Sequence, residues 1–288
     1  MQHAPFWRSL FFAPANRPDL LAKFGRVDAD NYVIDLEDGT PVEHKETARA
    51  QLHEAVAVAR QGDLRGRLLV RINVLDGPFG VHDLARALTC EIDGIVIPKL
   101  ENAAQLLDID TAMTAAGVRM AIVGGIESIA GVMDIAACVK VSKRLRAVYF
   151  GAEDLATEMG VRRTEASNEL LYARQRVVLA AKSASIAAID QAVTEIQNDA
   201  LFGRDAARGR DFGYDGKICL NPRQVGLANT AFRPDATEAA YAKRLLAAAR
   251  DAAASGHGVT SFEGRMIDAP LIARAQRIVA MVQALGET

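Results

Sequence analysis

The sequence predicts a (β/α)8 barrel followed by a C-terminal helical extension. Eight short apolar segments alternate with longer segments of helical spacing, which implies βαβ units and a parallel sheet. Seven of the apolar segments end on a charged or amide residue with little spacer. The 288 residues are enough for one such barrel. An open dinucleotide-binding sheet is the alternative, but its G-x-G-x-x-G turn does not follow the first strand.

The expected strands are short runs of aliphatic and aromatic residues, as in strands buried on both faces. They are Ser9–Ala13, Tyr32–Leu36, Leu68–Ile72, Gly94–Ile97, Met120–Val123, Ala147–Phe150, Ser185–Ile189 and Ile218–Leu220. Helical patterns lie between or after them, among them Glu43–Arg60, Ala103–Ala116, Thr164–Ala181 and Thr237–Ala254. Eight strands within about 220 residues favour a closed barrel over an open sheet.

The last part of the chain has a different pattern. Ser255-Gly-His-Gly258 reads as a flexible joint. A short segment, 259–267, follows it, and a terminal helix is expected from about Pro270. We therefore expect a barrel domain over residues 1–255 and a lid over residues 256–288. The alternative is a terminal helix that packs on the outside of the barrel.

Composition and charge exclude several classes of protein. The formal net charge of −2 gives no electrostatic footprint for nucleic acid or an anionic membrane. No run of about 18 uninterrupted apolar residues predicts a membrane span. The three cysteines are far apart and lack metal-site spacing, which is typical of reduced thiols in the cytoplasm. We expect a cytoplasmic protein with neither nucleic acid nor membrane as a partner.

Polar side chains gather where the expected strands end. In a barrel, the carboxyl ends of all strands meet at one mouth, where active sites are built. The residues concerned are Asp35, Glu37, Asp38, Arg71, Asn73, Lys99, Glu127, Glu153, Asp154, Asp190 and Asn221. These strand ends therefore predict a site lined by acids, an arginine and a lysine.

Glu127 and Asp154 are the candidate metal ligands. They follow adjacent strands and offer hard carboxylate oxygens, and no histidine or cysteine accompanies them. This donor set favours Mg²⁺, with Mn²⁺ as a second possibility. The alternative for Asp154 is a cap on the helix that begins near Leu155.

Arg71 and Lys99 each have two interpretations. The planar guanidinium of Arg71 suits a substrate carboxylate, and the alternative is a buried ion pair with Asp35 or Glu37. A divalent metal beside an arginine suits an α-keto or α-hydroxy acid. Lys99 is either a Schiff-base lysine or an ion-pair partner that orients the carboxylates. Nearby acids raise the pKa of a lysine, which favours the ion pair.

These motifs resemble the citrate lyase β-subunit and malyl-CoA lyase family of CoA-ester lyases, in the aldolase/citrate lyase superfamily. The matching segments follow one another in family order over nearly the whole chain. They are Arg8-Ser-Leu-Phe-Phe-Ala-Pro14, Asp35-Leu-Glu-Asp38, Val70-Arg-Ile-Asn73, Pro98-Lys99, Ile126-Glu127, Phe150-Gly-Ala-Glu-Asp-Leu155, Asp215-Gly-Lys217 and Gly264-Arg-Met-Ile-Asp268.

The resemblance implies a (β/α)8 barrel with Mg²⁺ on Glu127 and Asp154 and with the keto-acid product on Arg71 and the metal. It also implies a C-terminal lid whose aspartate, here Asp268, closes over a site, often that of a neighbouring subunit in a trimer or hexamer. We expect Asp268 to act as the acid–base group at the thioester carbon.

The remaining candidates complete the expected site. Asp35 and Lys99 join Arg71 and Asp268 as candidate catalytic residues. Arg17 and Lys23 are candidate contacts for CoA phosphates, and a solvated helix face is the alternative for both.

The resemblance implies Mg²⁺-dependent cleavage of a 3-hydroxyacyl-CoA of the malyl, methylmalyl, citramalyl or citryl type to an α-keto acid and an acyl-CoA such as acetyl-CoA. The alternatives are a citrate lyase β-subunit acting on a carrier-protein thioester, a class II aldolase, and a thioesterase. Related pyruvate aldolases carry Glu-His where this chain has Glu37-Asp38, which disfavours that class. Leu220-Asn-Pro222 replaces the common Ile-His-Pro and leaves the acyl group open.

Overall fold

The computed structural model describes residues 6–254 and 260–286. It divides the chain into two compact units, one ending at Phe232 and one beginning at Arg233. This division comes earlier than the boundary expected after residue 255, because Ala242 and Leu245 pack in one cluster with Ala275 of the C-terminal helix. The helix that carries the first two residues therefore belongs with the C-terminal segment.

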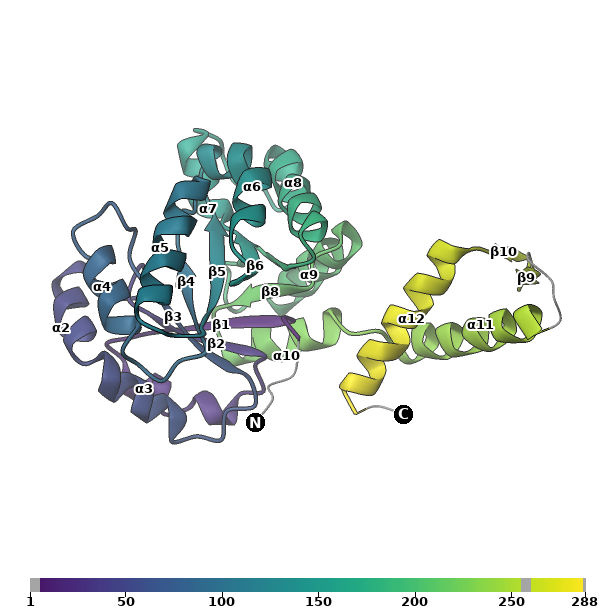
Figure 1. The fold of residues 1–288 in the computed structure, drawn as a ribbon, viewed down its shortest axis with the longest axis horizontal. Helices are drawn as coiled ribbons and strands as arrows, with labels where there is room; N and C mark the ends of the chain where they lie inside the picture. Colours follow the sequence, from purple (N-terminus) through teal and green to yellow (C-terminus); the bar gives the residue numbers. More distant parts are fainter. Residues whose placement is uncertain (1–5, 255–259, 287–288) are drawn as a thin grey trace. The chain divides into compact units, whose positions relative to one another are not determined.

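The first unit is a closed barrel of eight parallel strands, with β1 hydrogen-bonded to both β2 and β8 (Figure 1). This confirms the expected (β/α)8 fold. The strands are β1 (Ser9–Pro14), β2 (Asn31–Asp35), β3 (Arg67–Arg71), β4 (Gly94–Ile97), β5 (Ala121–Ile126), β6 (Leu145–Phe150), β7 (Ala187–Asp190) and β8 (Gly216–Cys219).

The largest difference from the expected strands is at the end of β5, which continues through Gly124 and Gly125 to Ile126. A Cβ at Gly124 would come within 2.6 Å of Leu100 Cδ2. The glycine therefore marks a close approach of the next segment rather than the end of the strand.

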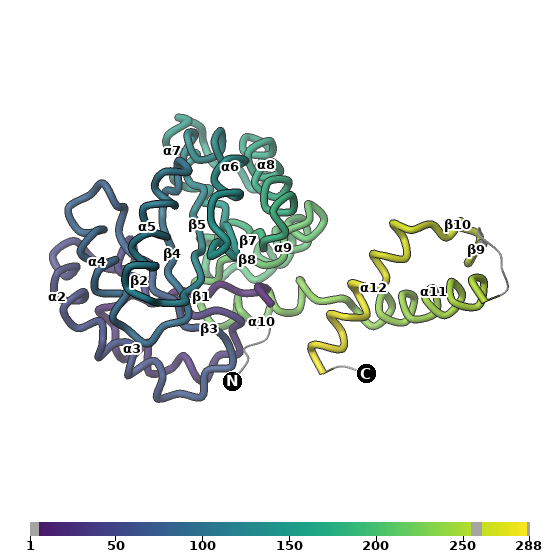
Figure 2. The backbone as a smooth tube through the Cα atoms, in the orientation of Figure 1, coloured from purple at the N-terminus to yellow at the C-terminus, as the bar shows by residue number. Residues whose placement is uncertain are grey.

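Helices surround the strands on the outside, as the tube in Figure 2 shows. They are α1 (Pro18–Leu21), α2 (Lys45–Ala50), α3 (Leu52–Arg60), α4 (Gly80–Ala87), α5 (Ala103–Ala115), α6 (Ile129–Val141), α7 (Ala152–Glu158), α8 (Leu171–Ser183), α9 (Asp199–Phe212) and α10 (Pro222–Ala231), with 3-10 turns η1 (Phe24–Arg26), η2 (Val42–His44) and η3 (Asn168–Leu170). The single helix expected over Glu43–Arg60 is broken at Gln51. The helix expected from Thr164 starts later, because Ser167 has a left-handed backbone with φ 48°.

Apolar side chains form two layers in this unit. A small cluster fills the barrel interior and comes from alternate strand positions, such as Ala147 and Tyr149 on β6. A larger cluster, which includes Val148 and Phe150 from the same strand, lies between the strands and the helices. The alternation explains why the strands read as continuous apolar runs.

The second unit is a helical hairpin with a small β-ribbon. It comprises α11 (Ala236–Ala254), β9 (Thr260–Phe262), β10 (Arg265–Ile267) and α12 (Ala269–Ala284). The strands pair in antiparallel fashion, and α12 begins within one residue of the expected Pro270. The expected joint Ser255-Gly-His-Gly258 lies outside the described residues.

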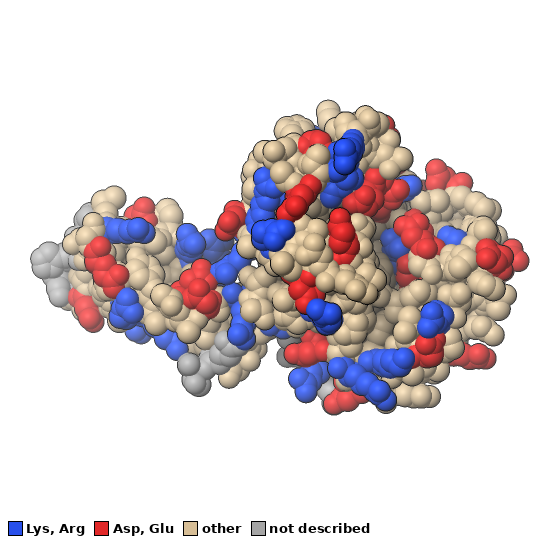
Figure 3. All heavy atoms as spheres, turned by 180° about the vertical axis from the view of Figure 1, so that it is seen from behind, with Lys and Arg blue, Asp and Glu red and all other residues tan. Residues whose placement is uncertain are grey.

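Figure 3 shows one face of the barrel, on which acidic and basic side chains are interspersed. This face has no large area of a single charge. Among the described residues, no helix combines the length and apolar character needed to cross a bilayer.

Candidate active site

A cavity of about 470 Å³ opens at the carboxyl ends of the strands. Residues on or just after β1, β2, β3, β5, β6, β7 and β8 line it, so nearly every strand contributes. Its polar lining residues are Asp35, Asp38, Arg71, Glu127, Tyr149, Glu153, Asp154 and Thr194. The structure thus brings Asp35, Arg71 and both candidate metal ligands to one cavity.

Glu127 follows β5 directly and is buried. Its Oε1 accepts hydrogen bonds from the backbone N–H of Lys99, at 3.2 Å, and from the hydroxyl of Tyr149. Two glycines make room for the carboxylate. A Cβ at Gly151 would lie 2.8 Å from Oε2, and one at Gly125 would collide with Oε1. The glycines thus leave space around Oε2, whereas hydrogen bonds fix the position of Oε1.

Burial raises the pKa of Glu127 from 4.5 to about 7. The hydrogen bond from Tyr149 and the charge of Arg71 act in the opposite direction but do not outweigh the loss of water. A divalent metal bound to Glu127 would lower this pKa, because it would stabilise the carboxylate charge that burial disfavours.

Asp154 lies in the first turn of α7, directly after the turn at Gly151. The residue before this helix is Gly151, and no side chain caps it, so Asp154 does not serve as the cap that was the alternative. Its carboxylate lines the cavity and is half exposed. Asp154 is therefore free to bind a ligand in the cavity.

Lys99 contacts both candidate ligands. Its Nζ lies 3.7 Å from Oδ1 of Asp154, while its backbone N–H binds Glu127. Lys99 has a φ of 45°, which is uncommon for a residue with a Cβ. In this conformation its backbone N–H contacts Glu127 while its side-chain amine contacts Asp154. Burial lowers the pKa of Lys99, but the charges of Asp154 and other nearby acids raise it more. A protonated amine agrees with the ion-pair interpretation and disfavours a Schiff base.

Arg71 is held by carboxylates on β2 and its following loop. Its Nε and Nη2 each lie 2.7 Å from one oxygen of Asp35, and its Nη1 lies 2.8 Å from Oε2 of Glu37. The ion pair that was the alternative for Arg71 is thus present. A guanidinium has five N–H donors, so Nη1 and Nη2 retain donors for a substrate carboxylate. Burial disfavours the charged guanidinium, but Asp35 outweighs it, and the pKa of Arg71 lies above its usual value.

Each carboxylate oxygen of Asp35 accepts two hydrogen bonds. Besides Arg71, Asp35 accepts from the backbone N–H groups of Glu37, at 2.9 Å, and Gly39, at 2.7 Å. A Cβ at Gly39 would lie 2.5 Å from Oδ2 of Asp35, so only glycine permits this loop. Asp35 is therefore placed to orient Arg71, and its expected catalytic role stays a prediction.

Glu37 is the least well satisfied acid of this group. Its Oε2 is buried and has no well-directed hydrogen bond, although Nη1 of Arg71 lies close to it. Burial raises the pKa of Glu37 from 4.5 to about 8, against the positive charge of Arg71. Burial thus raises the pKa of two neighbouring acids, Glu37 beside Arg71 and Glu127 in the cavity, to neutral pH or above.

Tyr149 was missed from the sequence. The sequence shows it only as one residue of an apolar strand, yet its hydroxyl donates to Glu127 inside the barrel. Strand alternation was the available signal. Phe150 packs toward the helices, so its neighbour Tyr149 must point inward, where a buried hydroxyl requires a partner.

Among the predicted site residues of the barrel unit, Lys99, Arg17 and Lys23 are not part of the cavity lining. Arg17 pairs with Asp19 at 2.8 Å, and both are half exposed. Lys23 is an exposed residue that precedes η1. Asp268 belongs to the second unit, where its side chain accepts from the N–H of Leu271 at 2.9 Å and caps α12. Their roles in CoA binding and acid–base chemistry stay predictions.

The donor set fits a hard divalent cation. Glu127 and Asp154 offer oxygen ligands only, and no group of three or more His, Cys, Asp or Glu in the described part of the chain is arranged to hold a metal. Mg²⁺ is usually bound by one or two protein carboxylates, and water and substrate fill its other coordination positions.

Residues 8–222 match the family model described as HpcH/HpaI aldolase/citrate lyase. The chain belongs to this family. The matched region contains all eight barrel strands and every residue that lines the cavity. The expected resemblance and the expected class, a carbon–carbon lyase, are confirmed by this membership.

Curated relatives match over almost the whole chain. A citrate lyase subunit beta-like protein of Deinococcus radiodurans is 41% identical over 275 residues, which is 95% of this chain and 96% of the relative. An L-malyl-CoA/beta-methylmalyl-CoA lyase of Cereibacter sphaeroides is 32% identical over 307 residues, covering 97% and 95%.

A solved structure also aligns over the full length. The CitE protein of Mycobacterium tuberculosis, in complex with magnesium, acetoacetate and coenzyme A, has a TM-score of 0.79 at 26% sequence identity. The alignment covers 97% of this chain and 98% of that one. That relative therefore binds magnesium and coenzyme A on the same fold.

Proposed function

We propose that the protein is a Mg²⁺-dependent lyase that cleaves a 3-hydroxyacyl-CoA thioester to an α-keto acid and an acyl-CoA such as acetyl-CoA. The observation that carries this proposal is the convergence of Glu127, Asp154 and Arg71 on one cavity. These are the groups that the family resemblance assigns to the metal and the keto acid. The magnesium and coenzyme A bound by the CitE relative support the same cofactor and carrier here.

The metal, when bound to Glu127 and Asp154, supplies a Lewis acid for the oxygens of the hydroxy acid. Arg71, oriented by Asp35, binds the substrate carboxylate through its remaining N–H groups. Lys99 holds the carboxylate of Glu127 through its backbone N–H, and its amine forms a looser ion pair with Asp154. Together these residues hold the hydroxy-acid end of the substrate in one orientation.

Cleavage is then a retro-aldol step. A base takes the hydroxyl proton, the carbon–carbon bond beside the hydroxyl-bearing carbon breaks, and its electrons pass to the thioester as an enolate. The former hydroxyl carbon becomes the keto carbon of the released acid. We assign protonation of the enolate carbon to Asp268, on a segment that closes over the cavity when substrate is bound.

We further propose a homo-oligomer, a trimer or hexamer, in which Asp268 serves its own site or that of a neighbour. Mixing experiments separate the two cases. Asp154→Asn and Asp268→Asn variants, each inactive alone, regain turnover as mixed oligomers if Asp268 acts in trans. A cytoplasmic location is proposed from the three cysteines, all free thiols.

A second candidate is a citrate lyase β-subunit that acts on a carrier-protein thioester. The 41% identity to a citrate lyase subunit beta-like protein favours this alternative. Arg17 and Lys23 separate the two, because they are the predicted contacts for CoA phosphates. If they serve CoA, replacing both with alanine raises KM for a CoA thioester and leaves a pantetheine thioester unaffected.

The deciding experiment is turnover of a panel of malyl-, methylmalyl-, citramalyl- and citryl-CoA with Mg²⁺, with product identification. A keto acid with an acyl-CoA indicates the lyase, and a hydroxy acid with free CoA indicates a thioesterase. Cleavage of the free hydroxy-keto acids alone indicates an aldolase. If no thioester of the panel is cleaved, the proposed function is wrong.

A further inference from the structure

Arg163 ties the helix that carries Asp154 to the barrel. It follows α7 in the chain, and its Nε lies 3.0 Å from Oε1 of Glu153, the residue before Asp154. Its Nη2 lies 3.2 Å from Oε1 of Gln191, just after β7. Its Nη1 contacts Oγ of Ser167 at 3.1 Å and Oε1 of Glu169 at 2.9 Å. One guanidinium thus joins the first turn of α7, the following loop and the end of β7.

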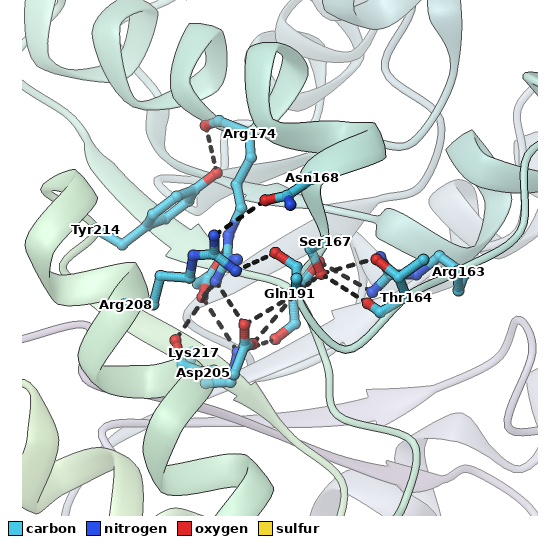
Figure 4. A network of polar contacts seen from close by, with 12 residues as sticks. Arg163, Thr164, Ser167, Asn168, Arg174, Gln191, Asp205, Arg208, Tyr214 and Lys217 are labelled. Atoms are coloured by element: carbon cyan, nitrogen blue, oxygen red, sulfur yellow. Dashed lines mark hydrogen bonds and ion pairs between the residues drawn. The ribbon is translucent and has the colours of Figure 1, made fainter.

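Gln191 is in turn fixed by buried charges (Figure 4). Its side-chain Nε2 lies 3.2 Å from both carboxylate oxygens of Asp205. Its backbone carbonyl accepts a hydrogen bond from Nζ of Lys217 at 2.7 Å. Arg174 and Asp190 complete this buried ion cluster. All four charged side chains are at most 7% exposed, and their charges cancel. The cluster is a rigid support on the barrel side of Arg163.

Ala152 and Leu155, which are buried in the large apolar cluster, anchor the inner face of the first turn of α7. No side chain caps the helix, and it is only seven residues long. Glu153 and Asp154 both line the cavity. Of the ion pairs described for them, Asp154 has the loose one with Lys99, at 3.7 Å, whereas Glu153 has the directed bond from Arg163. Apolar packing thus places the helix, and the bond from Arg163 to Glu153 is the directed polar contact on the cavity side of the turn that carries Asp154.

We propose that Arg163 is a positioning residue of the metal site: by holding Glu153 against Gln191 and the buried ion cluster, it orients the carboxylate of Asp154. The inference rests on the proposed function in that Asp154 binds Mg²⁺. Arg163 touches neither metal nor substrate in this account and acts only through Glu153. Outer residues that orient a ligand typically change metal affinity by 10–100-fold when removed.

The chain offers a matched control in Arg208, which anchors the same loop from α9 (Figure 4). Its guanidinium binds the carbonyl of Ala166 and, at 3.2 Å, Oδ1 of Asn168. Neither contact involves α7. Arg208→Ala therefore loosens the loop without releasing Glu153, and it separates positioning of Asp154 from general loosening of the loop.

The test is calorimetric titration of Mg²⁺ and Mn²⁺ into the wild-type protein, Arg163→Ala and Arg208→Ala, with hydrogen exchange of the α7 amides as a second readout. We expect the dissociation constant to rise about tenfold or more in Arg163→Ala, with faster exchange over residues 152–158, and to change little in Arg208→Ala. In a Glu153→Ala background, Arg163→Ala should add no further loss of affinity.

Equal metal affinity of wild type and Arg163→Ala, or equal losses in Arg163→Ala and Arg208→Ala, would overturn the inference while leaving the metal site intact. An additive loss in the double variant would also overturn it, because Arg163 would then act by another route. Failure of the wild-type protein to bind either metal would refute the proposed function itself, and the inference with it.

Discussion

The carboxylate of Asp35 holds the guanidinium of Arg71 side-on, with two nitrogen–oxygen distances of 2.7 Å. The two residues end neighbouring strands, β2 and β3, and are direct partners in the register. The pair is buried, so its geometry is not averaged by solvent. Arg71 therefore presents its free N–H groups to the cavity in one fixed orientation.

Replacing Asp35 with asparagine should lower both stability and activity. The guanidinium loses its bidentate partner while it stays buried, and breaking such a pair destabilises a protein by about 3–5 kcal/mol. Denaturant unfolding measures this loss, and kcat/KM should fall with it. Asp19→Asn is the control, because it breaks a similar bidentate pair with Arg17 on the surface and should change stability little. Equal effects of the two variants would contradict the account.

Glu127→Gln and Asp154→Asn should each abolish Mg²⁺ binding and reduce turnover by several orders of magnitude. Each replaces one of only two protein ligands with a neutral amide of the same shape. Calorimetry measures the binding and a product assay the turnover. Glu165→Gln, which removes a charge that pairs with Arg204 at the surface, is the control. Metal affinity of the wild-type level in Asp154→Asn would show that the metal lies elsewhere.

Tyr149→Phe should weaken Mg²⁺ binding by about 10–100-fold with little loss of packing, because it removes the hydrogen bond that holds Oε1 of Glu127. The same change should raise the pKa of Glu127 further, because the hydrogen bond from the Tyr149 hydroxyl lowers this pKa in the wild-type protein. Tyr214→Phe is matched in burial, and its hydroxyl donates to the carbonyl of Arg174. Comparable losses of metal affinity in both variants would assign Tyr149 a general structural role.

The pH dependence of the metal-free protein follows from Glu127 and Glu37. Their pKa values rise from 4.5 in the unfolded chain to about 7 and about 8 in the folded state. The folded state then binds more protons than the unfolded state, so stability falls as pH rises from about 4.5 to about 8. Thermal melting with EDTA across this range checks the sign. A melting temperature that rises over this interval would contradict the raised pKa values.

Metal binding should show the opposite dependence on pH. Mg²⁺ must displace the proton on Glu127, so its affinity increases with pH up to about 7 and then levels off. We expect about tenfold weaker binding at pH 6 than at pH 8. Calorimetry in buffers of different ionisation enthalpy measures the proton released. Binding without proton release at pH 6 would contradict this prediction.

The sequence predicted the barrel because each strand is a short apolar run that stops on a polar residue. It also located Glu127, Asp154, Arg71 and Asp35, since residues after the strands of a barrel must share one mouth. Tyr149 was missed because its role depends on which face of β6 it occupies. The pairing of Arg71 with Asp35 was only one of two alternatives, because strand register decides it and is not visible in one strand alone.

The contacts of the C-terminal segment were harder to predict. The boundary after residue 255 followed from glycines, whereas the observed division depends on packing of Leu245 with Ala275 in the α12 helix. Likewise, the contact of Arg163 with Glu153 joins residues whose spacing carries no periodic signal. Tertiary contacts of this kind need the three-dimensional structure.

The most direct test of the central claim is product stoichiometry for one cleaved 3-hydroxyacyl-CoA, measured with Mg²⁺ and with EDTA. The account predicts equal amounts of α-keto acid and acyl-CoA with Mg²⁺, and neither with EDTA. Release of free CoA with an intact hydroxy acid, or equal turnover in EDTA, would contradict it.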